Sequence, residues 1–169
     1  ANFYGLSKLI SEKQLEFYFN NFGLDITILR LASFFGPNLK KQFIYEFTRK
    51  ALYKKTIKLK GNREDKRDLL TIDYLVEIIS KLIKNKKIKY RIINIGSGNQ
   101  IKIISIIDKI NKILNFKNKI IFENNLKSPE FPLMNLNKLK KTVSIKNLNN
   151  NFDKILFKTV STIKKNGKN

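Results

Sequence analysis

Residues 25–32 read Asp25-Ile26-Thr27-Ile28-Leu29-Arg30-Leu31-Ala32, and the fold predicted for the whole chain rests on them. A near-continuous apolar run of this length is typical of a parallel strand covered on both faces. Before it, residues 4–22 form an amphipathic pattern that Gly23 follows at a common helix-ending position; the apolar stripe is Leu9, Leu15, Phe19 and Phe22. A helix followed by a buried strand is half of a β–α–β unit, so the sequence predicts an α/β fold.

The sequence after residue 32 continues this alternation. A second buried strand is expected over residues 90–95, parallel to the first but not necessarily beside it. Shorter strands are expected over residues 56–60 and 119–123, and helices over residues 43–53, 74–83, 101–114, 135–142 and 152–163. Residues 34–38 are interpreted as a turn closed by Gly36-Pro37, and Asp73 is expected to cap the helix that follows it. Because no repeat or linker interrupts the pattern, a single domain spanning residues 1–169 is the economical interpretation.

Composition narrows the possible chemistry. The chain contains no cysteine and no histidine, which removes a disulfide framework, a thiol nucleophile, the commonest metal ligand and the usual general base. No metal site is therefore expected, and Tyr, Lys, Asp and Glu remain as chemical groups. No apolar run reaches the roughly 18 residues of a membrane span, and the first residues do not resemble a signal peptide. We expect a cytoplasmic protein that does not bind membranes.

The net charge of +22, with 35 basic residues, is unusual for a chain of this size. Such a charge is typical of proteins that bind polyanions, and a basic nucleic-acid-binding module is one hypothesis for the chain. Nucleic-acid readers, however, concentrate Arg and aromatic residues on one surface, whereas these Lys residues are scattered among Asn and Ile. A base-composition bias of the source genome explains this pattern more simply, so no specific nucleic-acid partner is expected.

Tyr4 and Lys8 stand one helical turn apart, on one face of the predicted helix. A cation held near a phenol favours the phenolate, which allows a proton to be transferred near neutral pH. The pair is therefore a candidate catalytic site. The alternative interpretation is a solvated Lys above a half-buried Tyr with no chemical role.

Three further motifs follow this pair. Residues 29–37 read Leu-Arg-Leu-Ala-Ser-Phe-Phe-Gly-Pro, residues 67–73 read Arg-Asp-Leu-Leu-Thr-Ile-Asp, and residues 93–98 read Ile-Asn-Ile-Gly-Ser-Gly. In this order and spacing, the four motifs resemble the C-terminal half of an NAD-dependent epimerase/dehydratase, of the extended short-chain dehydrogenase/reductase family that includes UDP-glucose 4-epimerase. The resemblance implies the C-terminal portion of a Rossmann-like parallel sheet with flanking helices and a small substrate-binding lobe. It also implies a fragment that lacks the N-terminal dinucleotide-binding half.

The resemblance assigns roles to five residues. Tyr4 is expected to transfer a proton, and Lys8 to hold the nicotinamide ribose of NAD or NADP. Ala32 and Ser33 are expected to approach the nicotinamide and the substrate, although the family commonly has Asn where this chain has Ser33. Arg67 is expected to bind the diphosphate of a nucleotide-sugar substrate, a task suited to a planar bidentate donor.

Other parts of the family pattern are weaker in this sequence. Residues 67–73 lack the aromatic residue and the His that the family usually has there, and only Pro129 and Glu130 correspond to a further substrate-contact motif. Residues 96–98 lack the six-residue dinucleotide fingerprint, so we do not interpret them as a phosphate-binding loop.

The expected function is part of an NAD(P)-dependent nucleotide-sugar epimerase, dehydratase or reductase. The fragment itself is expected to be inactive. In the complete enzyme, the expected partners are the nucleotide-sugar substrate, the missing N-terminal half and a second copy forming a homodimer. Besides the polyanion-binding module, a catalytically silent scaffold derived from the enzyme remains an alternative.

Overall fold

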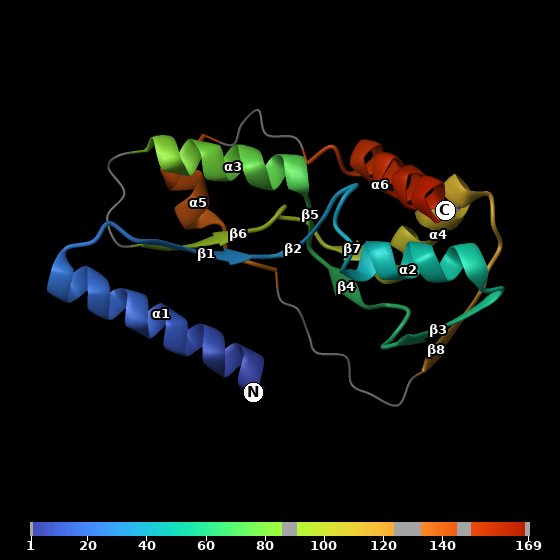
Figure 1. Cartoon of the computed structure of the whole chain (residues 1–169), viewed down its shortest axis with the longest axis horizontal. Coiled ribbons are helices and arrows are strands. Elements are labelled where there is room, and N and C mark those ends of the chain that lie inside the picture. Colours follow the sequence, from blue (N-terminus) through green and yellow to red (C-terminus); the bar gives the residue numbers. More distant parts are fainter. Residues whose placement is uncertain (1, 86–90, 124–132, 145–149, 168–169) are drawn as a thin grey trace.

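The computed structural model describes residues 2–85, 91–123, 133–144 and 150–167, arranged as two groups of helices around short strand pairs (Figure 1). In chain order, the elements are α1 (Phe3–Phe22), β1 (Thr27–Leu31), β2 (Ser33–Phe35), α2 (Phe43–Tyr53), β3 (Thr56–Lys60), β4 (Lys66–Arg67), β5 (Leu69–Thr71), α3 (Ile72–Lys84), β6 (Arg91–Ile95), β7 (Ile101–Lys102), α4 (Ile103–Leu114), β8 (Lys119–Glu123), α5 (Asn137–Thr142) and α6 (Phe152–Asn166).

Both predicted parallel strands are present, and they pair directly with each other. Strand β1 runs parallel to β6, with Leu29 opposite Ile93 and Leu31 opposite Ile95. The Ala32 amide extends the pairing by donating to the Ile95 carbonyl at 2.8 Å. Helices α1 and α3 lie on opposite sides of this pair (Figure 1). The predicted α/β class is therefore confirmed.

A first hydrophobic core lies between the β1–β6 pair and the helices α3 and α5. Its buried members come from the ends of the strands and from the apolar faces of the two helices: Ala32, Leu70, Tyr74, Leu75, Ile78, Leu82, Ile93, Ile95, Leu139 and Val143. The apolar pattern of β6 follows from this burial, because Ile93 and Ile95 are fully buried beneath the helices. For β1, the prediction of a strand covered on both faces is wrong: burial decreases toward its carboxyl end, where Leu31 is 38% exposed.

A second core is formed by α2, α4 and α6 together with the β3–β8 pair. Strands β3 and β8 are parallel, with Thr56 opposite Lys119, while β4 and β7 form a short antiparallel pair. The buried residues of this core are Phe35, Ile44, Phe47, Ala51, Ile57, Leu69, Ile103, Ile106, Ile107, Ile110, Leu114, Ile155, Leu156 and Val160. This second packing unit is larger than the first, whereas the family resemblance implied only a small lobe beside the sheet.

The turn predicted over residues 34–38 begins later in the structure, after Phe35. Residues Ser33–Phe35 form β2, which pairs in parallel with β5. Phe35 is only 2% exposed, and its ring packs edge-on against that of Phe152 at 5.2 Å. The turn follows this strand. Gly36 is needed there because a Cβ atom would lie 2.5 Å from Cγ2 of Ile72.

The predicted cap of α3 is also wrong. The helix begins at Ile72, and the Thr71 hydroxyl accepts a hydrogen bond from the Tyr74 amide at 3.3 Å. Thr71 has the extended backbone that an N-cap requires. Asp73 instead lies in the first helical turn, where its charge is favourable to the helix dipole.

The other element boundaries agree to within a few residues, except that α6 continues to Asn166. Tyr90, Pro129 and Glu130 lie outside the described residues, so the predictions made for them are not tested by the structure. Within the described ranges, no helix is long and apolar enough to cross a membrane.

Candidate active site

A hollow of about 470 Å³ opens where β1 and β6 end. Ala32, Ser33 and Arg67 all contribute to its lining, so three of the five predicted site residues come together here. Asn94 of β6 and Gln100 add polar groups to the same wall. Open α/β sheets bind ligands outside the carboxyl ends of their parallel strands, and this hollow has that position.

Ser33 and Arg67 also line a neighbouring hollow of about 220 Å³ that extends toward the second core. Its apolar walls include Phe43, Leu59 and Phe122. Because Ser33 and Arg67 line both hollows, they lie at the junction between the β1–β6 pair and the second packing unit. An elongated ligand that occupied both hollows would pass between them.

Arg67 is half-buried at this junction. One guanidinium nitrogen, Nη1, donates to the Lys66 carbonyl at 2.8 Å. Burial lowers the pKa of Arg67, and the charge of Asp65 partly opposes this change. Because a guanidinium ordinarily loses its proton only far above neutral pH, the group keeps its positive charge and can bind an anion through paired N–H groups.

Asp68, which sequence reasoning did not select, fixes the wall beside Arg67. Its carboxylate accepts hydrogen bonds from the Ser97 amide at 2.9 Å and from the Ser97 hydroxyl at 2.6 Å. A Cβ atom at Gly96 would lie 2.5 Å from this carboxylate, so the turn after β6 needs glycine there. Within the Gly96-Ser97-Gly98 segment, Ser97 therefore binds a carboxylate of its own chain.

A second residue that was not predicted for the site is Asn94, a polar residue inside the apolar strand β6. Asn94 stands within the β6 sequence Arg-Ile-Ile-Asn-Ile, and its side-chain amide donates to the Asn135 carbonyl at 3.2 Å. This contact ties the strand to the segment that completes the hollow. An isolated Asn in a buried strand could have indicated a site residue.

Tyr4 and Lys8 interact with each other on α1. The Lys8 ammonium lies 5.5 Å from the centroid of the Tyr4 ring, and 71% of the Tyr4 surface is exposed. For the described residues, the lining of the 470 Å³ hollow contains no residue of α1. The predicted site residues thus form two groups, the Tyr4–Lys8 pair on the helix and the Ala32–Ser33–Arg67 group at the sheet.

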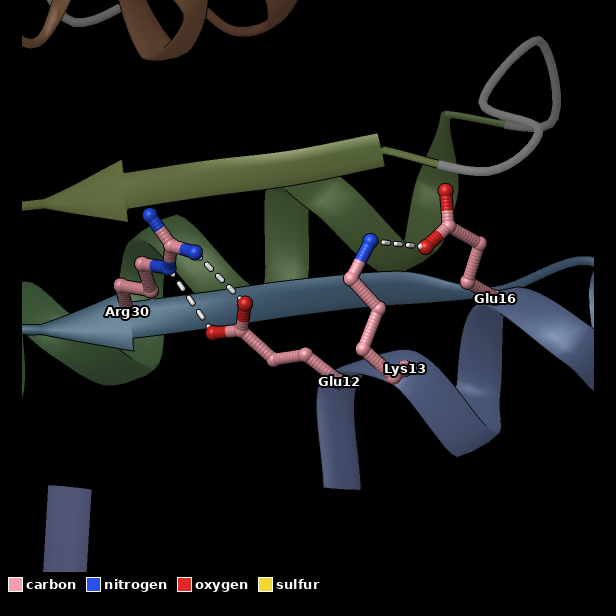
Figure 2. A network of polar contacts seen from close by, with 4 residues as sticks. All are labelled: Glu12, Lys13, Glu16 and Arg30. Atoms are coloured by element: carbon pink, nitrogen blue, oxygen red, sulfur yellow. Dashed lines mark hydrogen bonds and ion pairs between the residues drawn. The ribbon is translucent and has the colours of Figure 1, made fainter. Parts of the chain in front are cut away.

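An ion pair joins α1 to the sheet. The Arg30 side chain on β1 donates to both carboxylate oxygens of Glu12, at 2.8 and 2.5 Å (Figure 2). Lys13 and Glu16 form a second pair within the helix itself (Figure 2). The hydrogen bond from Arg30 is the main reason that the pKa of Glu12 is lowered. This bidentate contact orients α1 along the outer face of β1.

No residue of α1 is buried. Its large apolar side chains are exposed to solvent, several by more than half of their surface: Phe3, Tyr4, Leu6, Leu9, Ile10, Leu15, Phe17, Tyr18 and Phe22. We refer to this set as the α1 apolar face. Monomeric proteins seldom expose so many large apolar side chains on one helix, so this set is suited to contact with another polypeptide.

Comparison with known proteins places the chain in a family. Residues 1–96 match the model of the NAD dependent epimerase/dehydratase family, and the chain belongs to this family. An uncharacterized UDP-glucose epimerase of Bacillus subtilis is 28% identical over 127 residues, covering 71% of this chain and 40% of that protein. A putative UDP-glucose 4-epimerase of Methanocaldococcus jannaschii is 25% identical over 124 residues, with the same coverage of both chains.

Solved structures agree with the fold. RMD from Pseudomonas aeruginosa, solved with NADPH, superimposes with a TM-score of 0.86 at 17% identity, covering 98% of this chain and 57% of that one. The UDP-glucuronic acid 4-epimerase of Bacillus cereus, solved with NAD, gives a TM-score of 0.85 at 24% identity and covers 98% and 53%. The chain thus has the fold of part of a Rossmann-like enzyme. It spans 40% of the length of these curated relatives and about half of these structures.

Proposed function

We propose that this chain is part of an NAD(P)-dependent nucleotide-sugar epimerase, dehydratase or reductase, in which Tyr4 transfers a proton and Lys8 assists it. The observation that carries the proposal is the joint position of Ala32, Ser33 and Arg67 around one hollow at the carboxyl ends of β1 and β6. The Tyr4–Lys8 contact on the adjacent helix supplies the proton-transfer pair. Family membership makes this chemistry the first to test.

The groups present fit the nicotinamide end of NAD or NADP. Lys8 offers a cationic donor for ribose hydroxyls, and the small Ala32 and Ser33 leave room for a flat ring at the strand end. A bound nicotinamide would supply the acceptor and donor of hydride. The glycine-rich fingerprint for the cofactor's pyrophosphate does not occur in the 169-residue sequence, so these residues would hold only one end of the cofactor.

Proton transfer and substrate binding would be carried out by different residues of this chain. The Tyr4 hydroxyl would give or take the proton of a sugar hydroxyl, with the neighbouring ammonium of Lys8 stabilising negative charge on the phenol oxygen. Arg67 would bind the diphosphate at the junction of the two hollows. The Ser33 hydroxyl, between them, would orient the sugar.

The activity is proposed for a larger assembly, of which residues 1–169 form one domain. The upstream half of the same enzyme would supply the pyrophosphate site and cover part of the α1 apolar face. A second copy, forming a homodimer, would cover the rest. Support for this arrangement comes from the exposure of that face and from the partial coverage of the relatives.

Substitution of Tyr4 in the full-length enzyme tests the mechanism. Tyr4→Phe should lower turnover roughly 100- to 10,000-fold, the usual contribution of a positioned proton donor, while cofactor binding is kept. Tyr18→Phe, which changes another exposed tyrosine of α1, is the matched control and should retain activity. Unchanged turnover in Tyr4→Phe would contradict the assignment. A folded full-length protein that shows no turnover even with Tyr4 in place would favour a catalytically silent scaffold.

Calorimetric titration tests whether this chain holds only the nicotinamide end of the cofactor site. The 169-residue chain should bind NAD only weakly and show no epimerase or dehydratase activity, because it lacks the pyrophosphate fingerprint. A dissociation constant in the micromolar range for this chain alone would be inconsistent with half a site.

A further inference from the structure

A separate hollow of about 540 Å³ lies between α2 and the end of α6. The two helices lie side by side (Figure 1), and the segment around Pro37 and Lys40 completes the wall. None of its lining residues belongs to either hollow of the candidate active site. Its volume is within the range of about 300–1,000 Å³ that is usual for small-molecule sites.

The charge of this hollow is positive. Lys40 and Arg49 line it, and its lining includes no acidic side chain. The Arg49 guanidinium lies 5.9 Å from the centroid of the Tyr45 ring, which holds it beside the opening by a cation–π contact. In the described part of the chain, neither Lys40 nor Arg49 belongs to an ion pair. Both cations are therefore available to an anion.

The rest of the wall is aromatic and aliphatic. Tyr45 and Tyr53 contribute rings, and Leu52 and Ile163 contribute apolar surface from the helix–helix contact. The Tyr53 hydroxyl donates to the Gly167 carbonyl and so joins the ends of α2 and α6. A Cβ atom at position 167 would lie 2.7 Å from this hydroxyl, so glycine allows the closure. The hollow is thereby preformed at one end.

We propose that this hollow binds a ligand of mononucleotide size that carries a phosphate group and a planar aromatic ring. Lys40 and Arg49 bind the phosphate, because Arg offers paired N–H donors and the lining adds no competing carboxylate. The ring lies against Tyr45 and Tyr53 over the surface of Leu52 and Ile163. This site is independent of the proposed catalytic function, because no residue is shared between them.

Titration with adenosine 5′-monophosphate, followed by two-dimensional NMR, tests the proposal. The 169-residue chain would carry Leu9→Lys and Phe17→Lys, which lie outside the hollow and reduce self-association through the exposed apolar residues of α1. We expect saturable binding with a dissociation constant below about 1 mM, and shifts centred on residues 37–53 and 163–167. Arg49→Gln should weaken binding about tenfold or more, because it removes the charged half of the contact. Adenosine and inorganic phosphate, each supplying one half of the ligand, should both bind at least about tenfold more weakly.

Two control variants separate this site from its alternatives. Lys50→Gln removes the same charge from α2 outside the hollow and should leave the affinity unchanged. Arg67→Gln, in the candidate active site, should also leave it unchanged. Equal weakening by Lys50→Gln and Arg49→Gln would show binding to general surface charge and overturn the proposal. Loss of binding only in Arg67→Gln, or no saturable binding at 5 mM nucleotide, would overturn it as well.

Discussion

The buried carboxylate of Asp68 joins two segments that are 29 residues apart in sequence. Asp68 directly follows Arg67, the residue that is proposed to bind diphosphate, and its carboxylate contacts Ser97 in the turn after β6. Asp68 is 9% exposed, and the Ser97 amide and hydroxyl satisfy it. A charged group buried to this extent is tolerated only when hydrogen bonds replace its water, so Asp68 and Ser97 depend on each other.

Asp68→Ala should lower the free energy of unfolding by about 1–3 kcal/mol, because the Ser97 donors would lose their acceptor inside the protein. Urea unfolding followed by circular dichroism measures the change. Asp73→Ala, at an exposed position in the first turn of α3, is the control and should cost only a few tenths of a kcal/mol. Equal losses in both variants would contradict the role given to Asp68.

The start of α3 gives a second prediction for single residues. Thr71→Ala should cost about 1 kcal/mol or more, because the hydroxyl that accepts from the Tyr74 amide is lost at a fully buried position. Thr71→Ser keeps the hydroxyl and should recover part of this loss in the same urea measurement. If Thr71→Ser is no more stable than Thr71→Ala, the capping hydrogen bond does not matter and only the methyl group does.

At the scale of elements, the bidentate contact between Glu12 and Arg30 joins α1 to β1. The pKa of Glu12 is lowered below its ordinary 4.5, mainly by the hydrogen bond from Arg30. Because the folded pKa lies below the unfolded one, the contact stabilises the docked helix fully above about pH 4.5 and is lost as the pH falls through the folded value. Arg30 is about half exposed, so the pair contributes no more than about 1 kcal/mol.

Acidification should therefore loosen α1 while the two cores stay folded. ¹⁵N relaxation of the α1 amides should show higher mobility at pH 3 than at pH 6, and Glu12→Gln should show it already at pH 6. Glu16→Gln, whose partner Lys13 lies in the same helix, should behave like the unchanged chain. An α1 equally mobile at both pH values would mean that the pair does not hold the helix.

The elements that sequence patterns predicted well are those with their own periodicity. The bounds of α2, β3 and β8 agree with residues 43–53, 56–60 and 119–123. The segments that were missed, β2, β4, β5 and β7, have two or three residues each, and their partners lie far away in sequence. So short a strand has no readable period, because its state depends on its partner and not on its own residues.

The same limit applied to the candidate site. Ala32, Ser33 and Arg67 were found through motifs, and the structure brings them together. Asp68 was not predicted as a site residue because its importance comes from hydrogen bonds to Ser97, 29 residues away, which no local pattern encodes. Asn94 did carry a local signal, as a polar residue within an apolar strand, but its contact with Asn135 does not follow from that signal. The relation of Tyr4 to Ser33 stays a prediction. It requires both side chains to face one groove in the complete enzyme.

For the whole molecule, the buried apolar residues are unevenly distributed between the elements. Two cores enclose nearly all of the buried apolar residues, and both lie away from α1. In the described part of the chain, β1 pairs only with β6, so its other edge has no strand beside it. An open strand edge and a helix with exposed apolar side chains both favour association with another polypeptide. The high net charge opposes association of identical chains, which makes a complementary segment the better partner.

Co-expression with the upstream half of the enzyme should therefore give soluble protein that binds NAD, whereas the 169-residue chain alone should self-associate. Sedimentation velocity over a range of protein concentrations measures this, and Leu9→Lys combined with Phe17→Lys should reduce self-association by breaking the α1 apolar face. The same two substitutions should weaken capture of the upstream half, because one surface serves both contacts. A compact, monodisperse monomer that unfolds cooperatively without a partner would contradict the idea that the chain needs its missing half. In that case, function should be sought within residues 1–169 alone.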